Sequence, residues 1–294
     1  MWSHGERRAV TEPTEPAPLV PSSEFVQSLS RGLAVIRAFD ATHPELALSE
    51  VARATGLTRA TARRLLLTLV RLGYVRQEGN RFSLRPRVLE LGYSYLSALS
   101  LPELAQPHME ALVAEVNESS SIAVLDDTDI VYVVRVPTSR IMSITIAVGT
   151  RLPAYPTSMG RVLLAALEPD ALEERLGRMT LLPLTPTTVP DLSSLRAELE
   201  RVRDRGWAAV DQELEQGVRS VSVPIRNAGG TVSAAMNVSV HASRMTMQDL
   251  RKRVLPGLLR TAEAIEAELG AVAAPAARRV QLDSGSSKVE SAVR

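Results

Sequence analysis

The chain has 294 residues, 45% of them hydrophobic, and a formal net charge of +1, which suits a protein with two folded domains. It contains no cysteine, which excludes disulfide bonds, thiolate metal ligands and a cysteine nucleophile. Its four histidines lie far apart without HxxxH or HxH spacing, so we expect no metal site and no cofactor. The N-terminus is Pro-rich and no apolar run reaches 18 residues, which predicts a cytoplasmic protein without a membrane partner.

The first forty residues predict a tail followed by a helix. Residues 1–23 combine Pro with Glu, Thr and Ser and cannot build a core, so we expect disorder. Residues 25–39 carry apolar residues at helical spacing (25, 29, 33, 36 and 39), with Ser28 able to cap. This pattern predicts a first helix that packs on the unit that follows.

Residues 48–84 predict two short helices, a tight turn and a hairpin. Gly56 can take the positive φ that ends the first helix and begins the turn. Thr58 is placed to cap the second helix. The inward face of that helix is predicted from its i, i+3, i+4, i+7 spacing to hold Ala62, Leu65, Leu66 and Leu69.

The other face of the second helix is basic. From Arg59 to Arg87 there are eight arginines and one acid, Glu78, so the local charge is eight minus one, +7. A basic helix face is usually only a solvated face, but this one follows a turn glycine and precedes a hairpin. The hairpin alternates around Glu78-Gly79-Asn80, which we expect to form a three-residue turn.

These features together predict a winged helix-turn-helix, whose second helix enters the major groove of DNA. The residues expected at the DNA are Thr58, Arg59, Thr61, Arg63 and Arg64 on the helix, and Arg76 and Arg81 on the wing. A helix beginning at Pro86 and running to about Leu99 follows the wing. Its apolar residues lie on more than one side, which favours a linker and dimer contact: Val88, Leu89, Leu91, Tyr95 and Leu96.

From Leu101 onward the pattern is mixed. We expect helices over 103–116, 161–167, 169–177 and 191–206, and a long helix over 247–269 that is interrupted near Pro256. We expect strands over 121–125, 130–136, 141–148, 218–226 and 232–240. This order predicts an α+β fold. The expected organisation is a tail (1–23), a DNA-binding domain (24–85), a linker helix (86–100), a second domain (101–270) and a flexible C-terminal tail (271–294).

Three segments of the second domain could line a binding site. Residues 149–161 contain Gly and Pro and are expected to form a loop followed by the start of a helix. There, Ser158 and free backbone N–H groups could hold an anion. The second segment contains Asp211 and Ser220, and the third contains Asn237 and Ser239 on one face of a strand. An ordinary helix cap and solvated strand edges would explain the same residues. We identify no catalytic residue, since Ser158 lies in TSMG rather than in a GxSxG motif.

The chain resembles the IclR family of bacterial transcriptional regulators over residues 25–270. The stretches that carry the resemblance are FVQSLSRGLAVIRAFD at 25–40 and RIMSITIAVGTRLPAYPTSMGRVLLA at 140–165. It implies a winged helix-turn-helix, a linker helix and a GAF-like effector domain, most similar to the PcaR, PcaU and PobR branch that controls aromatic-acid catabolism through the β-ketoadipate pathway. The resemblance places the effector beside Ser158, Met159, Asp211, Ser220, Asn237 and Ser239. Some members have cysteine where this chain has Ser220.

The expected function is therefore a transcriptional regulator, not an enzyme. It would bind double-stranded operator DNA as a homodimer or a dimer of dimers, and respond to a small carboxylic acid such as protocatechuate, 4-hydroxybenzoate or β-ketoadipate. We expect the acid's carboxylate at the helix turn after Thr157, and a ring hydroxyl at Asp211. The alternatives are a regulator of another small-acid pathway, an architectural DNA binder without a ligand, and a tethered hydrolase using Ser158.

Overall fold

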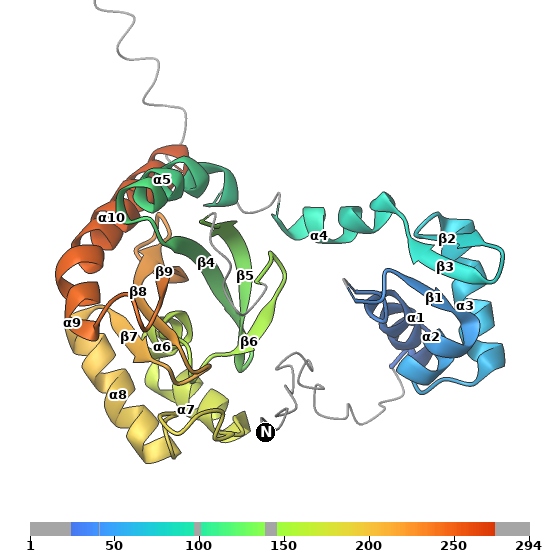
Figure 1. The fold of residues 1–294 in the computed structure, drawn as a ribbon, viewed down its shortest axis with the longest axis horizontal. Helices are drawn as coiled ribbons and strands as arrows, with labels where there is room; N and C mark the ends of the chain where they lie inside the picture. Colours follow the sequence, from blue (N-terminus) through green and yellow to red (C-terminus); the bar gives the residue numbers. More distant parts are fainter. Residues whose placement is uncertain (1–24, 41, 97–100, 139–145, 274–294) are drawn as a thin grey trace, which may run out of the picture. The chain divides into compact units, whose positions relative to one another are not determined.

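The computed structural model describes residues 25–40, 42–96, 101–138 and 146–273. It divides into two compact units, Met1–Ala98 and Leu99–Arg294 (Figure 1). The boundary falls within the predicted linker 86–100. The predicted tail 1–23 and residues 274–294 of the predicted C-terminal tail lie outside the described residues.

The N-terminal unit is the predicted winged helix-turn-helix. Its three-stranded sheet has the order β1-β3-β2, and the first of these strands was not predicted. The elements in chain order are α1 (Gln27–Arg37), β1 (Glu45–Ala47), α2 (Leu48–Ala54), α3 (Arg59–Leu72), β2 (Val75–Glu78), β3 (Arg81–Leu84), the 3-10 turn η1 (Pro86–Val88) and α4 (Leu89–Leu96).

The turn between α2 and α3 forms as predicted. Gly56 has a φ of +64°, and the N–H of Leu57 donates to the carbonyl of Ala52 at 3.0 Å, which closes α2 in a Schellman motif. Thr58 caps α3, because its hydroxyl accepts a hydrogen bond from the N–H of Thr61 at 3.2 Å. These local bonds fix the angle at which α3 leaves α2.

The buried cluster of this unit corrects the prediction for the first helix. Leu29 and Leu33 are 64% and 46% exposed, whereas Val35 is completely buried. An α-helix turns by about 100° per residue, so Leu33 and Val35 lie on nearly opposite faces and only one can pack inward. The helix is not capped by Ser28 either, since it begins after Val26 without a side-chain hydrogen bond. The cluster consists of Val35, Phe39, Leu46, Val51, Ala52, Ala62, Leu66, Leu69, Val75 and Phe82.

The wing turn has two residues, not the three predicted. Glu78 pairs directly with Arg81, which leaves Gly79 and Asn80 as the loop. Gly79 has a φ of +59°, and glycine at the first central position is typical of a type II′ turn. The shorter loop matches the right-handed twist of the two strands, so the hairpin continues to its tip.

The C-terminal unit is a six-stranded antiparallel sheet of order β6-β5-β4-β9-β8-β7, with helices on both faces (Figure 1). Helices α5 and α10 pack together against one face. Helix α6 packs on the other face and also contacts α8. The elements are α5 (Leu101–Val116), β4 (Ser119–Asp126), β5 (Asp129–Val136), β6 (Arg151–Pro153), α6 (Ser158–Ala165), α7 (Pro169–Arg178), α8 (Leu192–Arg205), β7 (Ala208–Asp211), β8 (Val218–Arg226), β9 (Val232–His241), α9 (Met247–Asp249), the π-helical turn η2 (Leu250–Val254) and α10 (Leu255–Ala273).

Two strands of this sheet differ from the prediction. Residues 141–145 of the expected strand 141–148 lie outside the described residues, and residues 146–148 are not part of a strand. The chain instead pairs with β5 through the three residues of β6, and β7 was not predicted at all.

The interruption predicted near Pro256 is the π-helical turn η2, just before that residue. Proline has no N–H to donate to a preceding carbonyl, which favours a change of register at this point.

Among the helices of the described residues, none has the length and apolar character needed to span a bilayer.

Candidate functional site

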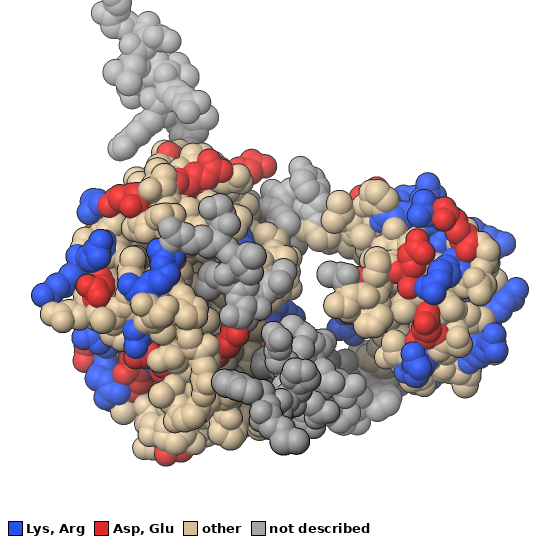
Figure 2. Space-filling view, in the orientation of Figure 1, with Lys and Arg blue, Asp and Glu red and all other residues tan. Residues whose placement is uncertain are grey.

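The exposed face of α3 carries positive charge that is not paired with a carboxylate of the described residues. The side chains of Arg59, Arg63 and Arg64 are exposed, and they make no hydrogen bond or ion pair with any described residue. Lys and Arg side chains gather at the outer edge of the N-terminal unit, over α3 (Figure 2). Such a row of free guanidinium groups suits the phosphates and guanine edges of a DNA groove.

The wing arginines are different, because each has a carboxylate neighbour. Arg76 lies 3.2 Å from Glu78, and Arg81 lies 4.0 Å from Glu50. All four side chains are at least one third exposed, so these pairs are weak. The wing nevertheless presents less unpaired positive charge than α3.

The start of α6 explains the TSMG sequence in structural terms. Thr157 caps the helix by accepting a hydrogen bond from the N–H of Gly160 at 3.0 Å. A Cβ atom at Gly160 would lie 2.0 Å from the carbonyl oxygen of Ala154, so no side chain fits there. Met159 is 1% exposed and packs in the hydrophobic core on this side of the sheet. The first turn of α6 therefore rests directly on the backbone of the preceding loop.

Four of the six predicted effector residues come together on the sheet face that α6 covers. The hydroxyl of Ser158 lies 2.9 Å from that of Ser220, and Ser220 pairs across the strands with Ser239. The Nδ2 of Asn237 donates to the Ser239 hydroxyl at 3.0 Å. Asn237 is 4% exposed, and its Oδ1 is buried and accepts no hydrogen bond from the described residues. A buried carbonyl oxygen of this kind normally accepts a hydrogen bond, so it is a candidate contact for a bound donor.

Asp211 does not join this group. It pairs across the strands with Arg219, whose Nε donates to its Oδ1 at 2.7 Å. The neighbouring pair is Val210 with Ser220, and successive side chains of a strand point to opposite faces. Asp211 thus faces away from Ser220 with its charge already compensated, and the predicted contact with an effector gains no support from these bonds.

The same sheet face holds polar residues that the sequence did not reveal. Arg135, Ser121 and Asn237 occupy one row across strands β5, β4 and β9. The Nη1 of Arg135 lies 3.4 Å from the Ser121 hydroxyl, and no carboxylate of the described residues is within ion-pair distance of it. Burial lowers the pKa of Arg135. We use the name sheet polar face for Ser121, Arg135, Ser158, Ser220, Asn237 and Ser239.

Tyr132 lies beside this face. It is 4% exposed in the core that packs against α6, and its hydroxyl makes no hydrogen bond with the described residues. Burial raises the pKa of Tyr132 to about 12, an effect that the nearby Arg135 cation partly opposes. A bulge between Ile122 and Ala123 brings Tyr132 and Arg135 to the same side although they are three residues apart.

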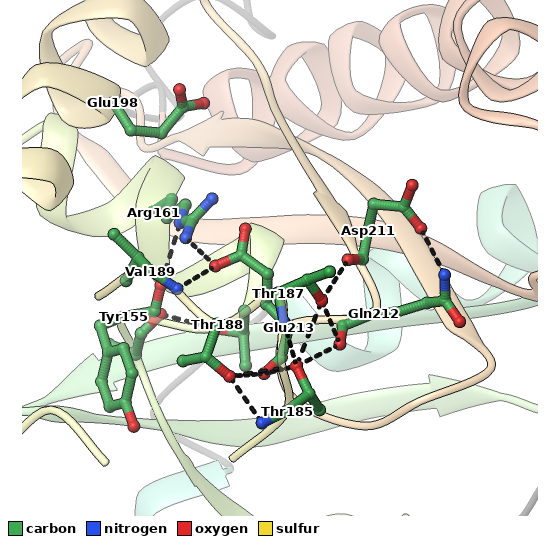
Figure 3. Close-up of polar contacts among 12 residues, drawn as sticks. Tyr155, Arg161, Thr185, Thr187, Thr188, Val189, Glu198, Asp211, Gln212 and Glu213 are labelled. Carbon is green, nitrogen blue, oxygen red and sulfur yellow. Dashed lines mark hydrogen bonds and ion pairs between the residues drawn. The ribbon is translucent and has the colours of Figure 1, made fainter. Parts of the chain in front are cut away.

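A second polar network, drawn in Figure 3, anchors α6 through Arg161. Arg161 is 3% exposed, and its guanidinium donates to the carboxylate of Glu213 at 2.6 Å and to the carbonyl of Tyr155 at 2.9 Å. The Glu213 carboxylate also accepts from the N–H of Val189 at 2.9 Å. The hydroxyl of Thr185 donates to the carbonyl of Gln212 at 2.8 Å, so the loop before α8 is tied to the β7–β8 connection. In the sequence, this loop stands out only by the Pro and Thr residues between 181 and 190.

Within the described residues, no three His, Asp or Glu side chains are grouped so that they could hold a metal ion.

Comparison with known proteins agrees with this architecture. The IclR helix-turn-helix domain matches residues 28–79, and the domain described as Bacterial transcriptional regulator IclR C-terminal matches residues 93–267. The chain is 46% identical over 237 residues to the Pca regulon regulatory protein of Pseudomonas putida, covering 80% of this chain and 81% of that protein. It is 36% identical over 248 residues to the p-hydroxybenzoate hydroxylase transcriptional activator of Acinetobacter baylyi, covering 83% and 92%.

One solved structure adds information on ligands. An IclR homolog from Microbacterium hydrocarbonoxydans, crystallised in complex with 4-hydroxybenzoate, has a TM-score of 0.74 and 28% identity, covering 83% of this chain and 99% of that chain. The two domain matches follow one another in chain order, and the second alone spans more than half of the residues. The chain therefore belongs to the IclR family of bacterial transcriptional regulators, which are DNA-binding proteins and not enzymes.

Proposed function

We propose that this protein regulates genes for the catabolism of aromatic acids, and that a small hydroxy-aromatic acid is its effector. The Pca regulon protein and the p-hydroxybenzoate hydroxylase activator support the pathway, and the homolog with bound 4-hydroxybenzoate supports the ligand class. The observation that carries the proposal is the Oδ1 of Asn237 on the sheet polar face, which is buried and accepts no hydrogen bond from the described residues. A ligand with a hydrogen-bond donor would satisfy it.

The effector is proposed to lie over the sheet polar face, beside the first turn of α6. Ser158, Ser220 and Ser239 offer hydroxyl groups, and Met159 contributes apolar contact from the same turn. The backbone N–H groups of Ser158 and Met159 donate to no acceptor among the described residues, as is usual in the first turn of a helix. Both kinds of group suit an oxygen-rich acid.

The DNA is proposed to meet α3 and the wing. Arg59, Arg63 and Arg64 would enter the major groove, with Thr58 and Thr61 beside them. The hydroxyls of these two threonines lie 2.9 Å apart, and that of Thr58 already accepts the cap hydrogen bond from the N–H of Thr61, so their role at the DNA is secondary. Arg76 and Arg81 would follow the phosphate backbone from the wing.

The regulator is proposed to act as a homodimer or a dimer of dimers, in the cytoplasm where its operator lies. One winged helix buries too little surface for tight binding, and a symmetric pair reads two half-sites. On α4, Leu89 and Leu91 are 71% and 50% exposed, which offers apolar surface for pairing. The predicted contacts of Tyr95 and Leu96 concern side chains outside the described residues. Sedimentation that finds a monomer at micromolar concentration would overturn this part.

A thermal-shift series tests the effector. A ligand that binds only the folded protein at a hundredfold excess over its Kd stabilises it by about 2.7 kcal/mol. We expect 4-hydroxybenzoate or protocatechuate to raise the melting temperature, and a sugar acid to leave it unchanged. Footprinting of the operator with and without the same acid then shows whether binding alters the interaction with DNA. If only non-aromatic acids stabilise the protein, it regulates another small-acid pathway. If no acid does, the architectural alternative is favoured.

A further inference from the structure

The sheet polar face contains a cation that pairs with no carboxylate of the described residues. Arg135 lies on β5, half-buried, with the Ser121 hydroxyl at 3.4 Å as its hydrogen-bond partner in the described residues. Two other buried or half-buried arginines of this unit have carboxylates, Arg161 with Glu213 and Arg219 with Asp211. A partly desolvated guanidinium is more favourable when an anion lies beside it.

The face also contains a buried acceptor. Asn237 uses its Nδ2 on Ser239, and its Oδ1 accepts no hydrogen bond from the part of the chain that the structure describes. This oxygen and the Arg135 guanidinium lie on the same face, because Arg135, Ser121 and Asn237 form one row of paired residues. A single molecule that brings an anionic group to one end and a donor to the other would satisfy both.

The separation of the two groups sets the size of that molecule. Neighbouring strands lie about 4.8 Å apart, and Arg135 and Asn237 are two strands from one another. The guanidinium reaches toward Ser121 on β4, so it lies between one and two strand spacings from Asn237. One benzene ring with substituents at opposite positions bridges a distance of this order. Tyr132, whose hydroxyl is also without a partner in the described residues, adds a donor on the Arg135 side.

We propose that Arg135 binds the carboxylate of the effector, and that the Oδ1 of Asn237 accepts a hydrogen bond from a hydroxyl at the opposite end of the same molecule. This inference rests on the proposed function and deepens it, since it selects a hydroxy-carboxylate over a dicarboxylate. It also reverses the orientation expected from the sequence, in which the turn after Thr157 received the carboxylate. Ser158 and Ser220 then lie along the ring or near its hydroxyl end.

Titration calorimetry of the full-length protein with three probes tests both contacts. The probes are 4-hydroxybenzoate, 4-hydroxybenzamide, which lacks the charge, and benzoate, which lacks the hydroxyl. Wild type should bind 4-hydroxybenzoate most tightly, by roughly 10- to 100-fold over the amide, because hydrogen bonds to charged groups are the stronger kind. Arg135→Met should remove the preference for acid over amide, while the preference for the hydroxyl remains. Asn237→Leu should do the reverse.

Two further variants separate recognition from folding. Arg135→Lys keeps the positive charge but loses the planar guanidinium that can bind a carboxylate with two parallel hydrogen bonds. It should therefore retain part of the preference for the acid. Arg151→Met, on the neighbouring strand β6, removes an arginine that already pairs with Asp126 and Asp129, and it should leave all three affinities in the wild-type order. Without ligand, Arg135→Met should melt at or above the wild-type temperature, because a poorly solvated charge has been removed.

The outcomes distinguish this inference from the proposed function. If wild type binds 4-hydroxybenzoate and Arg135→Met still prefers the acid over the amide, Arg135 does not receive the carboxylate and only this inference falls. If Asn237→Leu keeps the preference for the hydroxyl, the assignment of its Oδ1 is wrong. If wild type binds none of the three probes, the proposed aromatic effector is wrong and this inference falls with it.

Discussion

Gly160 sits where the first turn of α6 presses on the backbone of Ala154. A methyl group at Gly160 would lie 2.0 Å from the Ala154 carbonyl oxygen, so helix or loop must move. We expect Gly160→Ala to destabilise the C-terminal unit by roughly 1–3 kcal/mol or more, which is the range for overpacked sites. Chemical denaturation followed by circular dichroism measures the loss.

Gly177 provides the matched control for that substitution. It lies in α7, where no neighbouring atom is within 4 Å of the added methyl group. Gly177→Ala should stabilise the protein by about 0.5–1 kcal/mol, because alanine is the better helix former. A Gly160→Ala variant as stable as Gly177→Ala would show that the contact with Ala154 relaxes freely.

Glu215, in the β7–β8 connection, makes stability depend on pH. Its Oε2 is buried and accepts no hydrogen bond from the described residues, and burial raises the pKa of this carboxyl above its ordinary value of 4.5. A raised pKa in the folded state means that the protonated form folds better. Wild type therefore loses stability as the pH rises from the unfolded-state pKa through the folded-state pKa.

The test for Glu215 is a stability difference measured at two pH values. Glu215→Gln resembles the protonated carboxyl, so it should be more stable than wild type at neutral pH and equal to it in acid, below the unfolded-state pKa. Glu263→Gln, an exposed site on α10, should differ from wild type at neither pH. An equal gain at both pH values would point to a cause other than titration.

At the scale of elements, α3 and the wing should contribute differently to DNA binding. The side chains of Arg63 and Arg64 are exposed and unpaired within the described residues. Replacing both with alanine should weaken operator binding. The expected loss is roughly 1–3 kcal/mol for each arginine that contacts a base. Arg81 shares its charge with Glu50, so Arg81→Ala should weaken all sequences alike and reduce the salt slope by about one unit or less.

Fluorescence anisotropy with operator and unrelated duplexes, at several salt concentrations, measures both effects. Arg201→Ala removes an exposed arginine of α8 in the other unit and should leave both affinities unchanged. Unchanged operator affinity in the Arg63→Ala, Arg64→Ala double variant would mean that α3 does not enter the groove.

Elements whose bonds are local could be predicted from the sequence. The turn at Gly56, the cap at Thr58 and the buried face of α3 depend on residues within one or two helical turns. Strands β6 and β7 have three and four residues, which is too short for an alternating pattern to stand out.

The site could be predicted less completely, because it depends on strand pairing. Ser158, Ser220, Asn237 and Ser239 are candidates on the sequence and on the family resemblance, and the structure places them together. Arg135 reads in sequence as one polar residue at the end of an apolar strand. Only the register that sets it beside Ser121 and Asn237 places it on the sheet polar face. The register of β7 and β8 likewise turns Asp211 to the opposite face.

At the scale of the whole molecule, the division into two units predicts that effector binding and DNA binding can be abolished separately. Ser158 is 1% exposed and touches Ser220, so Ser158→Trp should fill the space that an effector would use. We expect no melting-temperature shift with 4-hydroxybenzoate, and operator affinity within about twofold of wild type. A full ligand shift in Ser158→Trp would place the effector elsewhere. Loss of DNA binding without unfolding would assign Ser158 to the structure that links the units.

The central position of β9 has a consequence for how the chain is made. Strand β9 lies between β4 and β8, and Ser121 meets its partner Asn237 only after more than a hundred further residues have been added. Contacts of such long range form late and slowly, whereas the helices and short hairpin of the N-terminal unit need only their near neighbours. During synthesis, the unit that carries α3 therefore completes its fold while the sheet still lacks its middle strand. A chain released before Val232 would hold a finished DNA-binding unit joined to an effector unit that cannot close.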